Sequence, residues 1–176
     1  MDERINIELK PVTHITTDAI GSPGKRVFYL QGSKDDQVVS LIVEKFQIQT
    51  LAIGVEQFLA EVHKKFPDLP EASASYNEEQ MHIRPPVEPL FRIGEIGLGY
   101  DEANDLVALE AREIVTQEGE EEKAGVVRFW STRAQMRAMV HWGMDVAERG
   151  RPLCPQCGQP LDPEGHFCPK KNGHKH

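Results

Sequence analysis

All three cysteines of the chain lie near its C-terminus, at spacings that suit a metal ion. Cys154 and Cys157 form a Cys-x-x-Cys pair, and Cys168 follows within the same 15 residues. Structural zinc sites take four ligands from Cys and His in a tetrahedron, so three clustered thiolates supply most of one site. The segment is short, polar and rich in proline and cannot bury a core of its own, but metal binding can supply its folding free energy. We therefore predict one structural Zn²⁺ ion per chain.

Two histidines are placed to complete this zinc site. His166 gives the pattern Cys-x2-Cys-x8-His-x-Cys, and His174 gives Cys-x2-Cys-x10-Cys-x5-His. Both patterns can supply four ligands to one tetrahedral ion. The spacing alone therefore leaves the fourth ligand open between the two.

Three other roles fit these cysteines less well. A thioredoxin-like redox pair needs a helix directly after the motif, whereas Gly158 and Pro160 follow it here. A disulfide would leave one cysteine unpaired, and no secretory signal favours oxidation. A catalytic zinc keeps one ligand position open, which three thiolates and the surrounding prolines disfavour. Cytosine and adenine deaminases carry His-x-Glu before the Cys-x-x-Cys pair, and no such sequence precedes it here.

Composition indicates a soluble globular protein of one domain with a small appendage. The chain has 176 residues, of which 39% are hydrophobic and 27% are charged. No run of 18 apolar residues occurs, so we expect no membrane-spanning segment and no membrane partner. The first four residues, Met-Asp-Glu-Arg, are unlike the start of a signal peptide. We therefore expect a cytoplasmic protein whose thiols stay reduced and able to bind metal.

The charge is unevenly distributed along the chain. The net charge is −8, but residues 149–176 hold five Lys or Arg against Asp162 and Glu164, which gives this segment +3 and the rest −11. An acidic body repels a nucleic-acid backbone, whereas a basic tail can approach one. The simpler interpretation is a solvated surface of mixed sign.

Hydrophobic alternation predicts strands in the first 43 residues. Residues 5–9, 26–31 and 38–43 alternate or are apolar in the manner of strands, and the β-branched run 12–20 is a further extended segment. The turn at residues 21–24 contains Pro and Gly at positions that favour a chain reversal. We expect these segments to form one antiparallel meander.

The period changes from strand to helix after Glu44. Pro67 ends the predicted helix, and the segment Pro67–Pro89 then holds five prolines with little periodicity, so we expect a long, partly mobile surface connection. The apolar residues of the helix recur at i, i+4, i+7 and i+8, which places them on one face: Leu51, Val55, Phe58, Leu59, Val62 and Phe66.

Strands return after this connection, and a second helix follows them. Residues 91–100, 106–114 and 126–130 have strand patterns, the first with one slip that indicates a bulge. Ser131 or Thr132 is suited to cap the helix, since Gln135 completes a capping box with Thr132. Gly150 suits the position just after the helix. The inner face of this helix is expected to hold Met136, Met139, Val140, Gly143 and Ala147.

The order of elements predicts an α+β fold made of two similar halves. We expect residues 1–66 to form a first βββ-α unit, residues 67–90 a Pro-rich linker, and residues 91–150 a second βββ-α unit. Residues 1–150 would then be an α+β body with one or two antiparallel sheets, and residues 151–176 a zinc-binding tail of the ribbon or knuckle type. The sequence leaves open whether the sheets merge.

Weaker functional signals occur elsewhere in the chain. The turn Gly21–Arg26 sets glycines beside two bases and can bind an anion, although a plain hairpin turn is simpler because the phosphate-loop spacing is absent. Glu44 and Glu110 lie near strand ends and can act as paired carboxylates, although exposed glutamates are common there. His141, next to Trp142 on the last helix, fits a surface or packing role. We assign no catalytic residue and no organic cofactor.

Several motifs resemble a bacterial family catalogued as domain of unknown function 3090. They are Ile20-Gly-Ser-Pro-Gly-Lys-Arg-Val-Phe-Tyr-Leu-Gln31, Phe91-Arg-Ile-Gly94 and the segment from Gly150 to Gly173. The resemblance covers nearly the whole chain, and the C-terminal motif is its most specific part. Because Gly-His-x-Cys-Pro-x-x-Asn-Gly recurs in that family, the resemblance implies His166 rather than His174 as the fourth ligand. It implies a fold and no reaction.

Two functions follow as expectations. The first is a non-enzymatic adaptor or binding protein, in which a structural zinc site presents a basic C-terminal surface to a protein partner or to a nucleic acid. The alternative is an enzyme or enzyme subunit that binds an anionic, phosphate-bearing ligand between the two halves. A pocket with convergent polar groups between the halves would favour the alternative.

Overall fold

The computed structural model describes residues 4–22 and 24–149, which form a mixed α/β fold. Seven strands and three helices follow one another along this part of the chain, with a 3₁₀ turn at Glu121–Lys123. In order, they are β1 (Asn6–Leu9), β2 (His14–Ile20), β3 (Val27–Lys34), β4 (Gln37–Val43), α1 (Lys45–Lys65), α2 (Glu78–Met81), β5 (Pro89–Asp101), β6 (Leu106–Glu113), β7 (Val126–Ser131) and α3 (Arg133–Glu148). The predicted zinc ribbon lies outside the described residues.

All seven strands belong to one sheet, in the order β1-β7-β6-β5-β4-β3-β2. Strands β2–β4 form one antiparallel meander and β5–β7 another, as predicted. The two meanders join through a short parallel pairing of β4 with β5, in which Ser40 lies opposite Pro89 and Ile42 opposite Arg92. The question of whether the sheets merge is therefore answered: they do.

The position of β1 corrects the prediction that the first strand belongs to the N-terminal meander. β1 pairs in parallel with β7, at the opposite edge of the sheet. The residues after β1 then cross to the other part of the sheet. The N–H of Val12 still donates to Trp130 O in β7 (2.7 Å), whereas the N–H of Thr13 donates to Ser33 O in β3 (2.7 Å). Alternating hydrophobicity identifies a strand, but it does not say which strand lies beside it.

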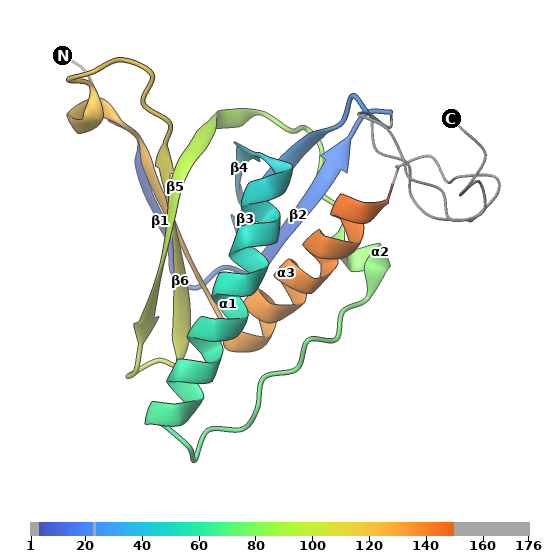
Figure 1. Cartoon of the computed structure of the whole chain (residues 1–176), viewed down its shortest axis with the longest axis vertical. Coiled ribbons are helices and arrows are strands. Elements are labelled where there is room, and N and C mark those ends of the chain that lie inside the picture. The colour runs from blue at the N-terminus through green and yellow to red at the C-terminus, as the bar shows by residue number, and fades with distance from the viewer. Residues whose placement is uncertain (1–3, 23, 150–176) are drawn as a thin grey trace, which may run out of the picture.

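The long helices α1 and α3 pack together and cover one face of the curved sheet (Figure 1). All five residues predicted for the inner face of α3 are buried, and Leu51, Val55, Leu59 and Val62 of α1 are buried as well. α3 lies very close to β2 at Gly143, where an added Cβ would come within 2.6 Å of the Thr17 methyl group. The core thus lies between the helix layer and the sheet.

Side-chain caps fix the start of each long helix. Thr132 accepts from the Gln135 N–H (3.0 Å), and the Gln135 side chain accepts from the Thr132 N–H (2.8 Å), which confirms the predicted capping box. At the start of α1, the Gln47 side chain accepts from the Glu44 N–H in the same way (2.7 Å). None of the helices in the described residues is long and apolar enough to cross a membrane.

The connection between α1 and β5 lies on the surface, as expected, and follows α3 and β2 closely (Figure 1). It contains the short helix α2, whose Met81 is buried against the core. Arg133 and Arg137 of α3 donate to the backbone oxygens of Pro70 (2.9 Å) and Ala72 (2.7 Å) in this connection. The connection therefore links the two halves by specific contacts along much of its length.

Candidate functional site

The four residues predicted to bind zinc, Cys154, Cys157, His166 and Cys168, lie outside the described residues, as does His174. The zinc site therefore stays a prediction. Across residues 4–22 and 24–149, no group of three or more His, Cys, Asp or Glu side chains is close enough to hold a metal ion. The described structure nevertheless shows the helix end from which the predicted zinc-binding tail continues.

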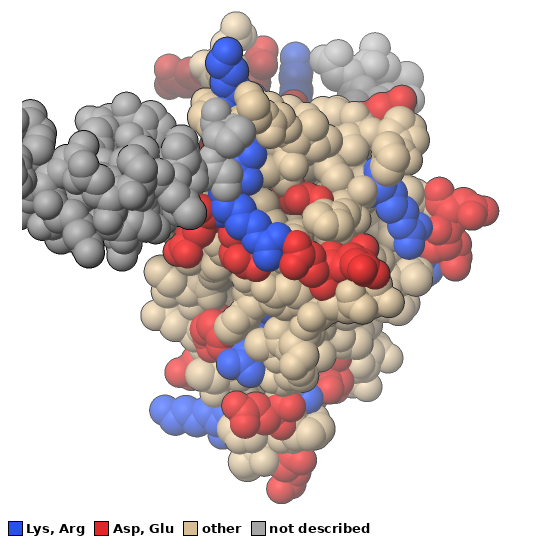
Figure 2. All heavy atoms as spheres, turned by 90° about the vertical axis from the view of Figure 1, so that its right-hand side faces the viewer, with Lys and Arg blue, Asp and Glu red and all other residues tan. Residues whose placement is uncertain are grey.

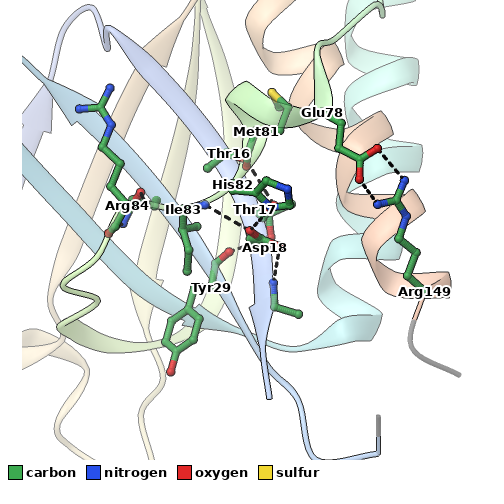
Figure 3. A network of polar contacts seen from close by, with 12 residues as sticks. Thr16, Thr17, Asp18, Tyr29, Glu78, Met81, His82, Ile83, Arg84 and Arg149 are labelled. Atoms are coloured by element: carbon green, nitrogen blue, oxygen red, sulfur yellow. Dashed lines mark hydrogen bonds and ion pairs between the residues drawn. The ribbon is translucent and has the colours of Figure 1, made fainter. Parts of the chain in front are cut away.

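The last turn of α3 is anchored by its final described residue, Arg149. The Arg149 guanidinium forms an ion pair with Glu78 of α2 (Figure 3). It forms a second with Asp145, one turn earlier on α3 (2.8 Å). It also lies 5.0 Å from the centre of the buried Trp142 ring. The hydrogen bond with Arg149 lowers the pKa of Glu78, and the same bond raises the pKa of Arg149. Both groups therefore stay charged at neutral pH.

The residues around α2 pack on the same part of α3. The Tyr76 hydroxyl donates to Asp145 (3.2 Å), and the rings of Tyr76 and His82 meet the Trp142 ring edge-on, at centroid distances of 5.6 and 5.4 Å. Asp18 of β2 accepts from the Ile83 N–H (3.2 Å) and bonds with His82 (3.0 Å) (Figure 3). The end of α3 is thus held by the residues around α2, which are in turn bonded to β2.

A polar pocket of about 320 Å³ lies between α1, α3 and the connection, and we call it the α1–α3 pocket. The pocket lies between the two predicted halves, since α1 belongs to the first and α3 to the second. The alternative function, an enzyme that binds an anion, required a pocket at this place. It is lined by Glu56, Leu59, Ala60, His63, Glu71, Ala72, Arg133 and Arg137.

Ion pairs engage both arginines of the α1–α3 pocket. Arg137 donates to both carboxylate oxygens of Glu56 (2.9 and 3.2 Å), which also bonds to His141. Arg133 forms a two-point contact with Asp105 in the β5–β6 turn (2.8 and 3.2 Å). Since each arginine also bonds to a backbone oxygen of the connection, much of its donor capacity is used within the fold.

Hydrogen bonding shifts the pKa values of the acids beside these arginines. The bond from Arg133 lowers the pKa of Asp105, and the Tyr100 hydroxyl, which donates to Asp105 at 2.7 Å, lowers it further. Burial together with this bond raises the pKa of Tyr100 to about 12. Burial also opposes ionisation of Glu56, but the bonds from Arg137 and His141 outweigh it and lower the Glu56 pKa. The carboxylates are therefore stabilised as anions, which does not suit a general acid or base at neutral pH.

The turn at Gly21–Arg26 is a tight link between β2 and β3. Gly21 and Gly24 have positive φ angles of 117° and 82°, a conformation that glycine adopts most readily. The Arg26 guanidinium donates to the Val146 oxygen on α3 (3.1 Å) and lies 5.0 Å from the Phe28 ring. The arginine of this turn thus connects the hairpin to α3.

The two glutamates considered as a catalytic pair each bond to a different arginine. Glu44 forms an ion pair with Arg92, whereas Glu110 forms one with Arg128 (2.6 Å). Glu110 lies opposite Gly97, which is five residues further along β5 than Arg92, a distance of roughly 17 Å in a strand. The structure therefore does not bring these two carboxylates together.

His141 and Trp142 occupy different environments although they are neighbours in sequence. His141 lies at the surface beside Glu56, whereas Trp142 is fully buried. The surface position of His141 agrees with one of the two roles, surface or packing, that the sequence suggested for it.

The functional networks of Arg133 and Arg137, with their partners Asp105 and Glu56, were missed by reasoning from sequence. Arg133, Arg137 and His141 recur every four residues on α3, and this spacing is a signal that one helix face carries a row of polar groups. Their partners Asp105 and Glu56 carry no local signal, because they are 28 and 81 residues away.

A comparison with protein families gives a match over most of the chain. The model of a family described as "Protein of unknown function (DUF3090)" matches residues 7–168. No curated protein and no solved structure matches the chain. The matched segment begins within β1 and ends on Cys168, so it contains nearly all of the described body and all four predicted zinc ligands.

Proposed function

Since the chain belongs to the family described as Protein of unknown function (DUF3090), and since the matched segment extends to Cys168, we propose that this protein is a non-enzymatic adaptor or binding protein. Its body would hold a structural zinc module, with Cys154, Cys157, His166 and Cys168 as ligands. The observation that carries the proposal is the set of three thiols and one imidazole at zinc-ligand spacing directly after α3. The module would present its basic surface to a protein partner, or to a nucleic acid.

The anchored end of α3 supports this role. Binding modules act best when they start from a rigid element, because a fixed start reduces the entropy lost on binding. Arg149 is joined to both α2 and α3, and its backbone N–H also closes the last turn by donating to the oxygens of Asp145 and Val146 (3.1 Å each). A module that begins two residues later would therefore start close to a defined position.

The charge of the body supports assigning the basic surface to the tail. On the face that includes the end of α3, basic and acidic side chains lie beside one another, without a large patch of one sign (Figure 2). The four Lys or Arg of residues 151–176 outnumber the two acids there. An anionic partner would therefore be attracted chiefly by the tail.

The zinc site is tested by metal analysis of the full chain and of four single variants. We expect about one zinc ion per chain in the wild type, and less than roughly a tenth of that in Cys154→Ser and His166→Ala. His174→Ala is the matched control and should keep its zinc, since it removes the competing candidate for fourth ligand. Lys171→Ala should also keep it. A wild-type protein that stays free of zinc after purification with added zinc under reducing conditions would contradict the site.

The binding role is tested by affinity capture with the immobilised full chain, comparing the wild type with Cys154→Ser and His174→Ala, each with and without nuclease. We expect a partner that the wild type and His174→Ala retain and Cys154→Ser loses. Loss after nuclease treatment would identify a nucleic acid. Identical captured material with all three proteins would refute a role for the zinc module in binding.

The α1–α3 pocket favours a second candidate, an enzyme or enzyme subunit that binds a phosphate-bearing anion. Its two arginines can each turn a remaining N–H toward a ligand. Titration calorimetry with inorganic phosphate and pyrophosphate tests this candidate, and Arg137→Ala should abolish any binding that Lys64→Ala, a change at an exposed lysine on α1, preserves. Absence of binding to the wild type at millimolar anion would leave the adaptor as the better proposal.

A further inference from the structure

One stripe of α1 remains exposed although it is strongly apolar. Phe46 and Ile53 are the most exposed large apolar side chains among the described residues, at 64% and 63%. With Thr50 between them, they are spaced by four and three residues, which sets them along one line of the helix surface. Exposure of these apolar side chains to water does not stabilise a monomer, so we expect a partner to cover the stripe.

A pocket lies directly beside this stripe. It has a volume of about 330 Å³ and lies between α1 and β5. Gly54 forms part of its wall, and an added Cβ at Gly54 would meet no atom within 4 Å. The side chains of α1 are therefore small at Thr50 and absent at Gly54, one turn apart, so another helix can approach the backbone of α1 closely there. The pocket is lined by Phe46, Gln47, Thr50, Leu51, Gly54, Gly94, Ile96 and Leu98.

The projecting side chain and the low surface are placed symmetrically. Phe46 lies four residues before Thr50, and Gly54 lies four residues after it. If two copies of α1 pair antiparallel about a two-fold axis at Thr50, residues equally far from Thr50 face each other. Phe46 of each copy then meets Gly54 of the other, and the same contact forms twice, as a two-fold interface requires.

The charge pattern also favours a second copy as the occupant. Residues 46–55 contain no Asp, Glu, Lys or Arg, although 27% of the chain is charged. Two copies that meet along this stretch therefore bury neither like charges nor an unpaired ion. Antiparallel pairing also sets the helix dipoles in opposite directions.

We propose that the protein forms a homodimer through antiparallel pairing of α1, in which Phe46 of each copy enters the pocket beside Gly54 of the other. The interface lies on the side of α1 that faces β5, and it uses none of the residues of the α1–α3 pocket. The dimer therefore leaves that pocket and the end of α3 accessible, and it is independent of the proposed function.

Sedimentation of the full chain from about 1 µM to about 100 µM tests the dimer. We expect Phe46→Glu to raise the dissociation constant by about thirtyfold or more, because it places a charge in an apolar contact. Gly54→Leu should weaken the dimer similarly by filling the pocket while leaving the helix intact, since the position is open. Val38→Ser, at an exposed apolar residue of β4, is the matched control and should leave the dimer unchanged. Circular dichroism melting would verify that each variant is folded.

Cross-linking tests the two-fold axis itself. Thr50→Cys places a thiol where the two copies are closest, and mild oxidation should join the two substituted positions, as peptide mapping by mass spectrometry can identify despite the native cysteines. The same oxidation of a chain that combines Thr50→Cys with Phe46→Glu should give little of this product. A protein that is monomeric at 100 µM, or a dimer that neither Phe46→Glu nor Gly54→Leu weakens, overturns the proposal and leaves the stripe to a different partner.

Discussion

Two arginines of α3 and Arg149, which caps its end, connect distant parts of the chain. Arg133 joins the β5–β6 turn to the connection, Arg137 joins α1 to the connection, and Arg149 joins α2 to the last turn of α3. An arginine suits these positions, because its planar group can bond a carboxylate with one edge and a backbone oxygen with another. Each of these residues therefore acts as a structural link rather than as a separate surface charge.

The effect of removing such a link should depend on its burial. We predict that Arg133→Met lowers the free energy of unfolding by about 2–3 kcal/mol, because loss of the buried guanidinium leaves the Pro70 oxygen without a donor and Asp105 without its ion-pair partner. Arg137→Met should cost only about 1 kcal/mol, since its pair with Glu56 is more exposed. Urea unfolding of both variants measures the difference. Equal losses would show that burial does not control these pairs.

The β5–β6 turn should make stability depend on acid pH. Hydrogen bonds from Asn104 and Lys10 lower the pKa of Asp101 to about 2, and Asp105 is also lowered. A carboxylate with a depressed pKa in the folded state stabilises the fold above its unfolded pKa, roughly 3.9, and this contribution is lost as pH falls toward 2. We predict that Asp101→Asn loses less stability than the wild type between about pH 4 and pH 2, by denaturant midpoints. Asp36→Asn, in the exposed β3–β4 turn, should follow the wild type.

At the scale of elements, the contact between α3 and β2 depends on Gly143. Apart from the Thr17 methyl, an added Cβ would also come within 3.0 Å of the Ile48 side chain on α1. The glycine thus lets three elements meet at one point. Its low helix propensity is offset by the closeness of packing that it permits.

Gly143→Ala should therefore destabilise the fold although alanine favours helices. We predict a loss of about 1–3 kcal/mol from overpacking. Thr17→Ser should restore part of this loss in the double variant, because serine lacks the methyl group but keeps the hydroxyl that donates to the Tyr29 oxygen. Thermal melting of the two single variants and the double variant measures the coupling. Additive losses would contradict the predicted contact.

The elements themselves were largely predictable, because their signals are local. The helix cap at Thr132, the apolar faces of α1 and α3, and the strand alternation all depend on residues within a few positions of each other. The pairing of β1 with β7 depends on residues about 120 positions apart, and no local pattern encodes it. Likewise, the connection had no periodicity to reveal that Tyr76 and Met81 pack on α3 and the core.

At the scale of the whole molecule, the sheet and both long helices are complete before the predicted tail begins. We predict that a chain ending at residue 151 still unfolds cooperatively, because the contacts that close α3, including those of Arg149, are retained. Its melting temperature should stay within a few degrees of the zinc-loaded full chain, about the effect of 1 kcal/mol. Loss of a cooperative transition in calorimetry would show that residues 152–176 belong to the core.

The crossing of β1 to the far edge of the sheet has a consequence for biosynthesis. β1 leaves the ribosome before the other described strands, yet its hydrogen-bonding partner β7 is made only after seven other strands and helices. Such a late, long-range closure slows folding relative to neighbouring hairpins. The side chain of Leu9, which is buried in the folded protein, therefore stays uncovered until residues 126–131 have emerged. A chaperone that holds nascent chains would bind at this end of the protein.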